Sequence, residues 1–302
     1  MNKILKAFKN PRLAILYVLD TKIGHLFPDK NYLKLKYRLT MCKKLNLKNP
    51  QGFNEKLQWL KLYNRKSECT VMVDKHLVRQ YIADKLGEEY LIPLLGVWDD
   101  PEDIDFDKLP DKFVLKCNHN SGLGMCICKD KSKLDIENAK KELRKGLKQN
   151  YYYNGREWPY KNVPRKIIAE QFLEDGTGDL VDYKFMCFNG NVECILVCCE
   201  RFSDDGVKMS FFDTDWNVLP FKRKHKAVKE GFPKPANFDN MMEYARLFSK
   251  DIPFLRVDFY EVNNNLYFGE LTFYPASGFE KFIPEEWDYT LGSWIKLPTD
   301  SE

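Results

Sequence analysis

The sequence predicts an α+β fold, because helix-like and strand-like segments occur in separate blocks rather than in alternation. Helical periodicity is clearest in residues 54–63 and 74–86. From residue 110 onward most segments are short and rich in β-branched and aromatic residues, and Asn189-Gly190 and Asn263-Asn264-Asn265 are typical hairpin turns. With 302 residues, of which 14% are aromatic and 30% charged, the chain is ordered and forms one large domain or two smaller ones.

The N-terminal third is expected to be mainly helical. Residues 1–65 form a helical N-terminal region, and the helix at 74–86 ends at Gly87. The elements expected next are a strand at 91–97, a strand and its returning partner within 111–117 and 125–130, and a helix at 134–148. Residues 151–163 are an irregular, aromatic-rich loop, and its length suggests a functional role.

The C-terminal half is expected to be rich in hairpins. The expected elements are a strand within 165–175, a turn at Gly176-Thr177-Gly178, a hairpin over 182–202, a second hairpin over 211–220, a helix at 238–248 and a last hairpin from 255. This order of strands, then a helix, then strands again supports the α+β class.

The last hairpin carries two carboxylates. If the three asparagines form its loop, Val262 faces Leu266, Asp258 faces Glu270, and Arg256 faces Thr272. Alternation places Phe268 on the same face as these polar residues. Opposed carboxylates about 5 Å apart repel each other unless a cation lies between them. A divalent ion with bound phosphates fits that position, and a solvated strand face is the alternative.

Charge and cysteine content limit the cellular setting. The net charge is +4, so we expect no nucleic-acid partner, and nine cysteines without a secretory leader indicate reduced thiols and a cytoplasmic location. Cys187, Cys194, Cys198 and Cys199 are expected at buried strand positions. Residues 1–25 fit either a basic amphipathic helix at the inner membrane face or an ordinary helix packed on the domain.

Three further segments could bind phosphate, nucleotide or metal. Lys116 precedes a loop with two glycines, which is either a phosphate-binding loop or a plain hairpin. Lys184 lies in a strand, where a salt bridge to Asp182 is the alternative interpretation. Asp213 and Asp215 form an Asp-x-Asp triplet after an apolar strand, which is typical of metal-dependent glycosyltransferases and also of a polar turn.

Six segments, taken in order, resemble the ATP-grasp superfamily and its TupA-like (teichuronopeptide-biosynthesis-like) branch. They are VDKHLVRQYI, FVLKCNHNSGLGMCIC, IIAEQFLED, DYKFMCFNG, LRVDFYEV and YFGELTFYPASGF. The resemblance implies two α+β subdomains with ATP held between them, after the helical N-terminal region. It implies an ATP-grasp domain over 66–302, with a lid at about 95–168 and a central mixed sheet at about 169–302.

The resemblance also implies roles for individual residues. ATP would be bound by Lys75, Lys116, His119, Asn120, Ser121, Gly122, Gly124, Glu170, Gln171, Phe172, Leu173, Asp182 and Lys184. Magnesium would be held by Asp258 and Glu270, with Thr272 where the superfamily often has asparagine; Arg256 and Lys184 would be catalytic, and Tyr274, Ser277 and Gly278 would bind substrate. The implied cofactors are ATP and Mg²⁺.

The implied reaction is ATP-dependent ligation of a carboxylate to an amine through an acyl phosphate. An amino acid joined to a uronic acid in a bacterial surface polysaccharide, such as a capsule, is the expected substrate pair. A kinase outcome stays open for this class. The alternatives are a glycosyltransferase that uses Asp213 and Asp215, and a non-enzymatic, nucleotide-gated module of a membrane assembly.

Overall fold

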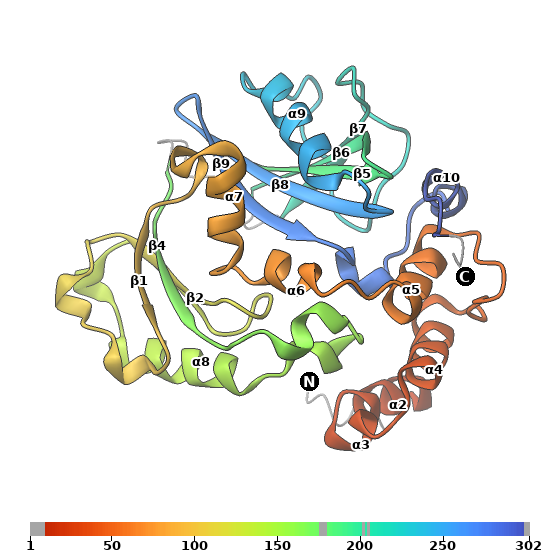
Figure 1. The fold of residues 1–302 in the computed structure, drawn as a ribbon, viewed down its shortest axis with the longest axis horizontal. Coiled ribbons are helices and arrows are strands. Elements are labelled where there is room, and N and C mark those ends of the chain that lie inside the picture. The colour runs from red at the N-terminus through yellow and green to blue at the C-terminus, as the bar shows by residue number, and fades with distance from the viewer. Residues whose placement is uncertain (1–9, 175–179, 201–202, 204–205, 299–302) are drawn as a thin grey trace.

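The computed structural model describes residues 10–174, 180–200, 203 and 206–298. The N-terminal region is helical as expected, and the turn predicted at Gly176-Thr177-Gly178 lies outside the described residues. Its helices are α2 (Pro11–Leu19), α3 (Lys22–His25), α4 (Asp29–Met41) and α5 (Phe53–Tyr63). Figure 1 shows α2, α3 and α4 gathered at one corner of the molecule, with α5 leading from them towards the sheets.

The first sheet has four strands in the order β1-β4-β2-β3, and each pair is antiparallel. Its strands are β1 (Leu94–Trp98), β2 (Phe113–Cys117), β3 (Met125–Cys128) and β4 (Ile167–Gln171). Phe113 and Leu115 alternate with less buried neighbours and pack with Leu143 of α8 (Ile136–Lys148). The subdomain boundary expected at about residue 168 lies within β4, which ends at Gln171.

The second sheet has five strands in the order β7-β6-β5-β8-β9. Its strands are β5 (Asp182–Phe188), β6 (Asn191–Cys199), β7 (Lys208–Phe212), β8 (Phe254–Val262) and β9 (Asn265–Thr272). A mixed sheet was expected, but its strand pairs in the described part of the chain are all antiparallel. Parallel pairing with this sheet occurs at isolated bridges, such as Leu91 with Phe268.

The main core lies around the five-stranded sheet. Every residue of β5 is buried, and helix α9 (Phe238–Ser249) packs against the sheet through ring contacts such as Phe185 with Phe238. The β5–β6 hairpin turns at Asn189 and Gly190, whose φ angles of 50° and 87° fit a tight hairpin turn. All nine cysteines are free thiols, and the four predicted to lie in buried strands do so.

The helix expected at 74–86 begins later, as α7 (Val78–Leu86), and an unpredicted helix, α6 (Glu68–Val73), precedes it. The Asp74 carboxylate accepts hydrogen bonds from the backbone N–H groups of His76 and Leu77 and from the Asn118 side chain at 2.8 Å. This turn between the helices holds Lys75 beside the loop that follows β2. Figure 1 shows α6 and α7 passing between the two sheets.

The chain closes with helix α10 (Glu286–Trp294), which packs against α5. The remaining elements are 3₁₀ turns, at Glu88–Tyr90, Pro101–Asp103, Phe106–Lys108, Lys131–Lys133, Tyr151–Asn154 (η5), Trp158–Asn162 (η6) and Pro275–Gly278 (η7). Within the residues that the structure describes, no helix is long and apolar enough to cross a membrane.

Candidate active site

The β8–β9 hairpin turns on two asparagines rather than the three expected. Asn263 and Asn264 have φ angles of 51° and 64°, as a two-residue hairpin turn requires. Val262 therefore faces Asn265, so the predicted pairing with Leu266 is wrong.

A β-bulge restores the predicted register at the site. The register shifts between Asp258 and Phe259, which leaves Gly269 as the extra residue of β9. Asp258 consequently faces Glu270, and Arg256 faces Thr272, as predicted.

The same bulge corrects one predicted position and explains the glycine. Phe268 pairs with Phe259 and is buried in the core, not on the polar face where it was expected. A Cβ atom at Gly269 would lie 2.9 Å from the backbone oxygen of Asp258. The bulge therefore needs glycine at this position.

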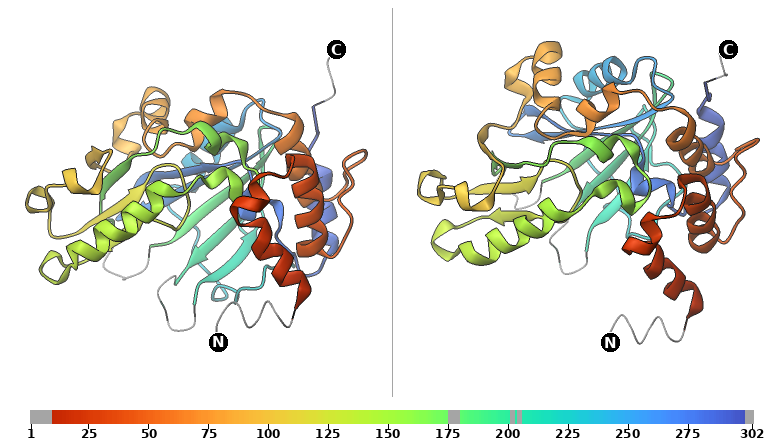
Figure 2. Two further views of the ribbon diagram at one scale, coloured as in Figure 1. Left: turned by 90° about the horizontal axis from the view of Figure 1, so that it is seen from below. Right: turned by 60° about the horizontal axis from the view of Figure 1, so that its bottom comes forward.

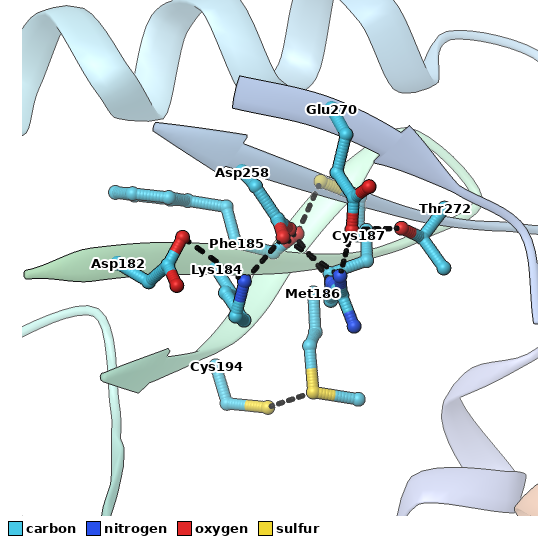
Figure 3. Close-up of polar contacts among 10 residues, drawn as sticks. Asp182, Lys184, Phe185, Met186, Cys187, Cys194, Asp258, Glu270 and Thr272 are labelled. Carbon is cyan, nitrogen blue, oxygen red and sulfur yellow. Dashed lines mark hydrogen bonds and ion pairs between the residues drawn. The ribbon is translucent and has the colours of Figure 1, made fainter. Parts of the chain in front are cut away.

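Arg256 bridges the two carboxylates. Its Nε and Nη2 atoms donate to the two oxygens of Asp258 at 2.6 and 2.7 Å, and Nη2 also donates to Glu270 at 2.8 Å. Lys184 approaches Asp258 to 2.5 Å and Asp182 to 3.2 Å. Figure 3 shows Lys184 lying between these two aspartates and Thr272 beside Glu270. The repulsion expected between opposed carboxylates is thus offset by fixed cations.

Glu270 and Asp258 differ in their access to the cavity. Asp258 is 1% exposed, whereas the Glu270 side chain is 38% exposed. Burial by itself raises the pKa of Glu270, but the charges of Arg256, Lys75, Lys184 and other cations outweigh that effect and lower its pKa to about 2. Glu270 is therefore ionised at neutral pH.

A cavity of about 560 Å³ lies between the two sheets, next to this cluster. Predicted ATP residues that line it are Lys75, Lys116, Asn120, Ser121, Gly122, Glu170, Gln171, Phe172, Leu173, Asp182 and Lys184. The residues that sequence reasoning missed include Ile92, Val114, Leu123, Met125, Ile127, Lys129, Leu180 and Tyr260. Val114 and Ile127 are cross-strand partners, and the parity of Val114 with Lys116 was a signal that could have found them.

Lys116 and Glu170 form the charged end of this cavity. Lys116 approaches Glu170 to 2.5 Å, and Arg79, which was not predicted, lies 3.4 Å from the other oxygen of Glu170. Lys75 donates to the backbone oxygen of Asn120 at 2.7 Å, and burial lowers the pKa of Lys75. Lys75 and Lys116 line the cavity and provide positive charge suited to a polyphosphate, whereas Arg79 contacts Glu170 from outside it.

Two residues predicted to bind ATP have structural roles instead. His119 is 1% exposed, and its Nε2 atom lies 3.1 Å from the backbone oxygen of Gln149. A Cβ atom at Gly124 would lie 2.7 Å from Cα of Gly146 in α8. Both residues hold the loop against α8, and neither lines the cavity.

A second cavity, of about 430 Å³, shares Ser121 and Glu270 with the first. Of the predicted substrate residues, Tyr274 and Ser277 line it. Gly278 does not, because it packs against Gln58, whose Nε2 atom would lie 2.4 Å from a Cβ atom there. Pro275 and Ala276, which lie in the same predicted substrate segment, also line it, and the lining residues that were not assigned individually are Lys36, Tyr151, Asn154, Glu157, Tyr160 and Phe279.

Lys61 is a buried residue that supports the wall of the second cavity through hydrogen bonds. It is fully buried, and its ammonium donates to the backbone oxygens of Gly155 and Ser277, both at 2.7 Å, and to the Ser277 hydroxyl at 3.0 Å. Ala276 and Ser277 have φ angles of 47° and 54°, a left-handed backbone that costs energy outside glycine. These hydrogen bonds keep the strained η7 turn in place.

Asp213 and Asp215 form a turn outside both cavities. One Asp213 oxygen accepts from the backbone N–H groups of Asp215 and Asn217, at 3.0 and 2.8 Å. This is a side-chain-capped turn after β7, which matches the structural alternative for the triplet.

The residues of the cluster fit Mg²⁺, which prefers oxygen ligands. Glu270 and the Thr272 hydroxyl would hold the ion from the cavity side. Both oxygens of Asp258 are engaged by Arg256 and Lys184. Asp258 would therefore contact the ion only when one of these cations turns towards phosphate. A bound ion would supply charge neutralisation for the transferred phosphoryl group.

A comparison with protein families identifies the class of protein to which this chain belongs. The model of the family described as TupA-like ATP-grasp matches residues 55–296, and the chain belongs to that family. The predicted enzyme class, an ATP-grasp ligase, and the predicted cofactors, ATP and Mg²⁺, agree with this membership.

Solved structures with a similar fold are distant. D-alanine–D-alanine ligase from Bacillus anthracis complexed with ATP is 15% identical, with 67% of this chain and 53% of that chain covered and a TM-score of 0.39. D-alanine–D-alanine ligase from Helicobacter pylori is 15% identical, with 82% and 70% covered and a TM-score of 0.41. A RimK domain ATP-grasp protein from Sphaerobacter thermophilus is 12% identical, with 77% and 70% covered and a TM-score of 0.41. The chain thus spans about half of the B. anthracis ligase, and no curated protein matches it.

Proposed function

We propose that this protein joins a carboxylate to an amine at the expense of ATP, and that the pair is a uronic acid or related carboxylate and an amino acid of a bacterial surface polysaccharide. The observation that supports ligation is the meeting of two cavities at Glu270 and Ser121. One cavity has the size and the cations for a nucleotide. The other gives the carboxylate and amine substrates access to Glu270.

The residues divide the work between the two cavities. Lys116 and Lys75 bind the phosphates of ATP, and the apolar pair Val114 and Ile127 packs against the base. Arg256 and Lys184 stabilise the negative charge that develops as the γ-phosphoryl group passes to the substrate carboxylate.

The second step needs no protein nucleophile. The amine nitrogen attacks the acyl carbon, the phosphate leaves with the electron pair of the C–O bond, and the amine releases one proton. The products are an amide, ADP and phosphate.

The test is ADP release with Mg-ATP against amino acids and uronic acids, alone and in pairs. The proposal expects ADP only when a carboxylate and an amine are both present, and loss of release in Glu270→Gln. ADP release with one substrate alone would indicate a kinase. Release that requires a nucleotide sugar and is lost in Asp213→Asn would favour the glycosyltransferase.

We also propose that the N-terminal helices contact an anionic membrane surface from the cytoplasmic side. Ile23 and Leu26 are 61% and 84% exposed, and Ile15 and Val18 are exposed on α2. Lys22 lies among them and would face lipid phosphates. Flotation with vesicles containing phosphatidylglycerol tests this contact, and Leu26→Glu should reduce binding. Equal flotation of both proteins would contradict the proposal.

A further inference from the structure

The second cavity contains groups of both charges that the nucleotide does not need. Glu157 is 4% exposed and faces this cavity, and Lys36 reaches it from α4 with a side chain that is 13% exposed. Lys36 precedes the segment that the family model matches, which begins at residue 55. The N-terminal helices therefore contribute Lys36 to a cavity whose other lining residues lie within the matched segment.

The end of the cavity near Glu157 has the chemistry of an ammonium site. The rings of Tyr151 and Tyr160 form one wall with their centroids 4.8 Å apart, and Tyr274 forms another. Aromatic faces and a buried carboxylate together attract an alkylammonium group. The Glu157 carboxylate is held by a hydrogen bond with Ser277, whose hydroxyl also accepts from Lys61.

Lys36 has the chemistry of a carboxylate site. Its ammonium donates to the Tyr32 hydroxyl at 3.0 Å and lies 3.3 Å from Asp20, whose side chain is 51% exposed. An ammonium has three N–H donors, and among the described residues these are its two hydrogen-bond acceptors. The ammonium also lies over the rings of Tyr32 and Phe279, 5.4 and 5.6 Å from their centroids, and keeps one N–H without a hydrogen-bond acceptor among the described residues for a ligand in the cavity.

A buried cation fixes α4 relative to the loop that carries Glu157. Arg156 is 1% exposed and donates to the backbone oxygens of Gly24 and Phe27 at 2.9 and 3.1 Å. It lies 3.2 Å from Asp29 at the start of α4 and covers the ring of Tyr32 at 4.2 Å. Figure 2 shows the N-terminal helices, in red, beside the green segment that contains η5 and η6. Lys36 and Glu157 thus belong to one rigid site.

We infer that the second cavity binds the amine substrate as an amino-acid zwitterion, with its ammonium at Glu157 and the tyrosines and its carboxylate at Lys36. The inference rests on the proposed ligase function and assigns the residues that hold its amino acid. It also gives α4 a role in specificity. The carboxylate that is activated would lie beside Arg256 and Glu270, which line the same cavity as Glu157, so the amine nitrogen can reach it.

The test is equilibrium dialysis of labelled L-alanine, L-serine, L-glutamate and L-lysine against the full chain loaded with Mg²⁺ and a non-hydrolysable ATP analogue. We expect at least one amino acid to bind saturably and its α-amide to bind about 10- to 100-fold more weakly, as for a lost charge-assisted hydrogen bond. Lys36→Met should weaken binding of the amino acid by the same factor and leave binding of the amide unchanged. Glu157→Gln should weaken the binding of both.

The matched control is Lys34→Met, which removes an exposed lysine from the same helix and should change nothing. The inference is overturned if no amino acid binds to the nucleotide-loaded protein, or if amino acid and amide bind equally. The amide comparison uses the wild-type protein, so it holds even where Glu157→Gln fails to fold. Failure of the ATP analogue itself to bind would instead refute the proposed function.

Discussion

The Asp258→Asn and Glu270→Gln variants should both lose activity, but they should differ in stability, which separates the roles of the two carboxylates. Asp258 is the counter-ion of Arg256 and Lys184, whose side chains are 11% and 9% exposed. Removing one partner of a buried ion pair costs about 3–5 kcal/mol, because the other charge stays buried. Asp182 and Glu270 lie near the two cations and partly compensate, so we expect the lower end of that range.

These energies convert to melting temperatures that differ between the variants. At roughly 2 °C per kcal/mol for a chain of this size, Asp258→Asn should lower Tm by about 6 °C or more. The Glu270 side chain is 38% exposed, so water screens most of the stabilisation that its lowered pKa implies, and we expect Glu270→Gln to cost no more than about 1 kcal/mol. Both variants should lose about 100-fold or more in ADP release, since each helps to neutralise the transferred phosphoryl group.

The assay is differential scanning calorimetry beside the ADP-release assay. A Tm for Asp258→Asn within about 2 °C of wild type would refute the assignment of Asp258 as the buried centre of the cluster, because that shift corresponds to only about 1 kcal/mol. A large Tm loss in Glu270→Gln would equally contradict its placement at the cavity surface.

Lys116→Met should weaken binding of a Mg-ATP analogue about 10-fold in calorimetry, as expected for one lost charge-assisted contact to phosphate, whereas Lys112→Met, at an exposed ion pair, should not. Gly269→Ala should destabilise the fold by about 1–3 kcal/mol in denaturant unfolding, because its Cβ atom would lie 2.9 Å from the Asp258 carbonyl oxygen; an unchanged midpoint would contradict the bulge. The pKa of Glu270 falls from 4.5 unfolded to about 2 folded, so its ionised form stabilises the fold fully above about pH 4.5 and less as the pH falls towards 2. The Tm difference between wild type and Glu270→Gln should therefore be constant from about pH 5.5 to 8 and change below about pH 4.5; a change near pH 7 would contradict that pKa.

The sequence predicted the centre of the site because strand parity is a strong local signal. Asp258, Glu270 and Arg256 meet as the alternation indicated. The agreement depends on two errors that cancel, since a loop one residue too long was offset by an unforeseen bulge at Gly269. Bulges depend on close backbone approach across the pair, which hydrophobic periodicity does not report.

The loop after β2 shows where residue type misleads. His119 and the glycines that follow Lys116 suggested that the residues of this loop bind phosphate, with a plain hairpin as the alternative. In the fold, His119 and Gly124 are used to fasten that loop to α8. A short loop must satisfy its own buried polar groups before its remaining residues can face a ligand.

The second cavity was least accessible to sequence reasoning. The family resemblance indicated Tyr274 and Ser277, and the unusual length and aromatic content of residues 151–163 indicated a role for that loop, but no local pattern links Glu157 with Lys36 or Lys61. These residues come together through the docking of the N-terminal helices by Arg156, which is a long-range contact. Acceptor pockets are assembled from separate segments in this way, so sequence spacing does not reveal them.

The central claim is that the carboxylate is activated as an acyl phosphate in the space around Glu270. The most direct measurement is transfer of ¹⁸O from the labelled carboxylate substrate to phosphate, followed by mass spectrometry of the phosphate released with ADP. The account predicts one ¹⁸O atom in each phosphate formed together with amide. Unlabelled phosphate formed together with amide, with the second labelled oxygen recovered in water, would contradict it.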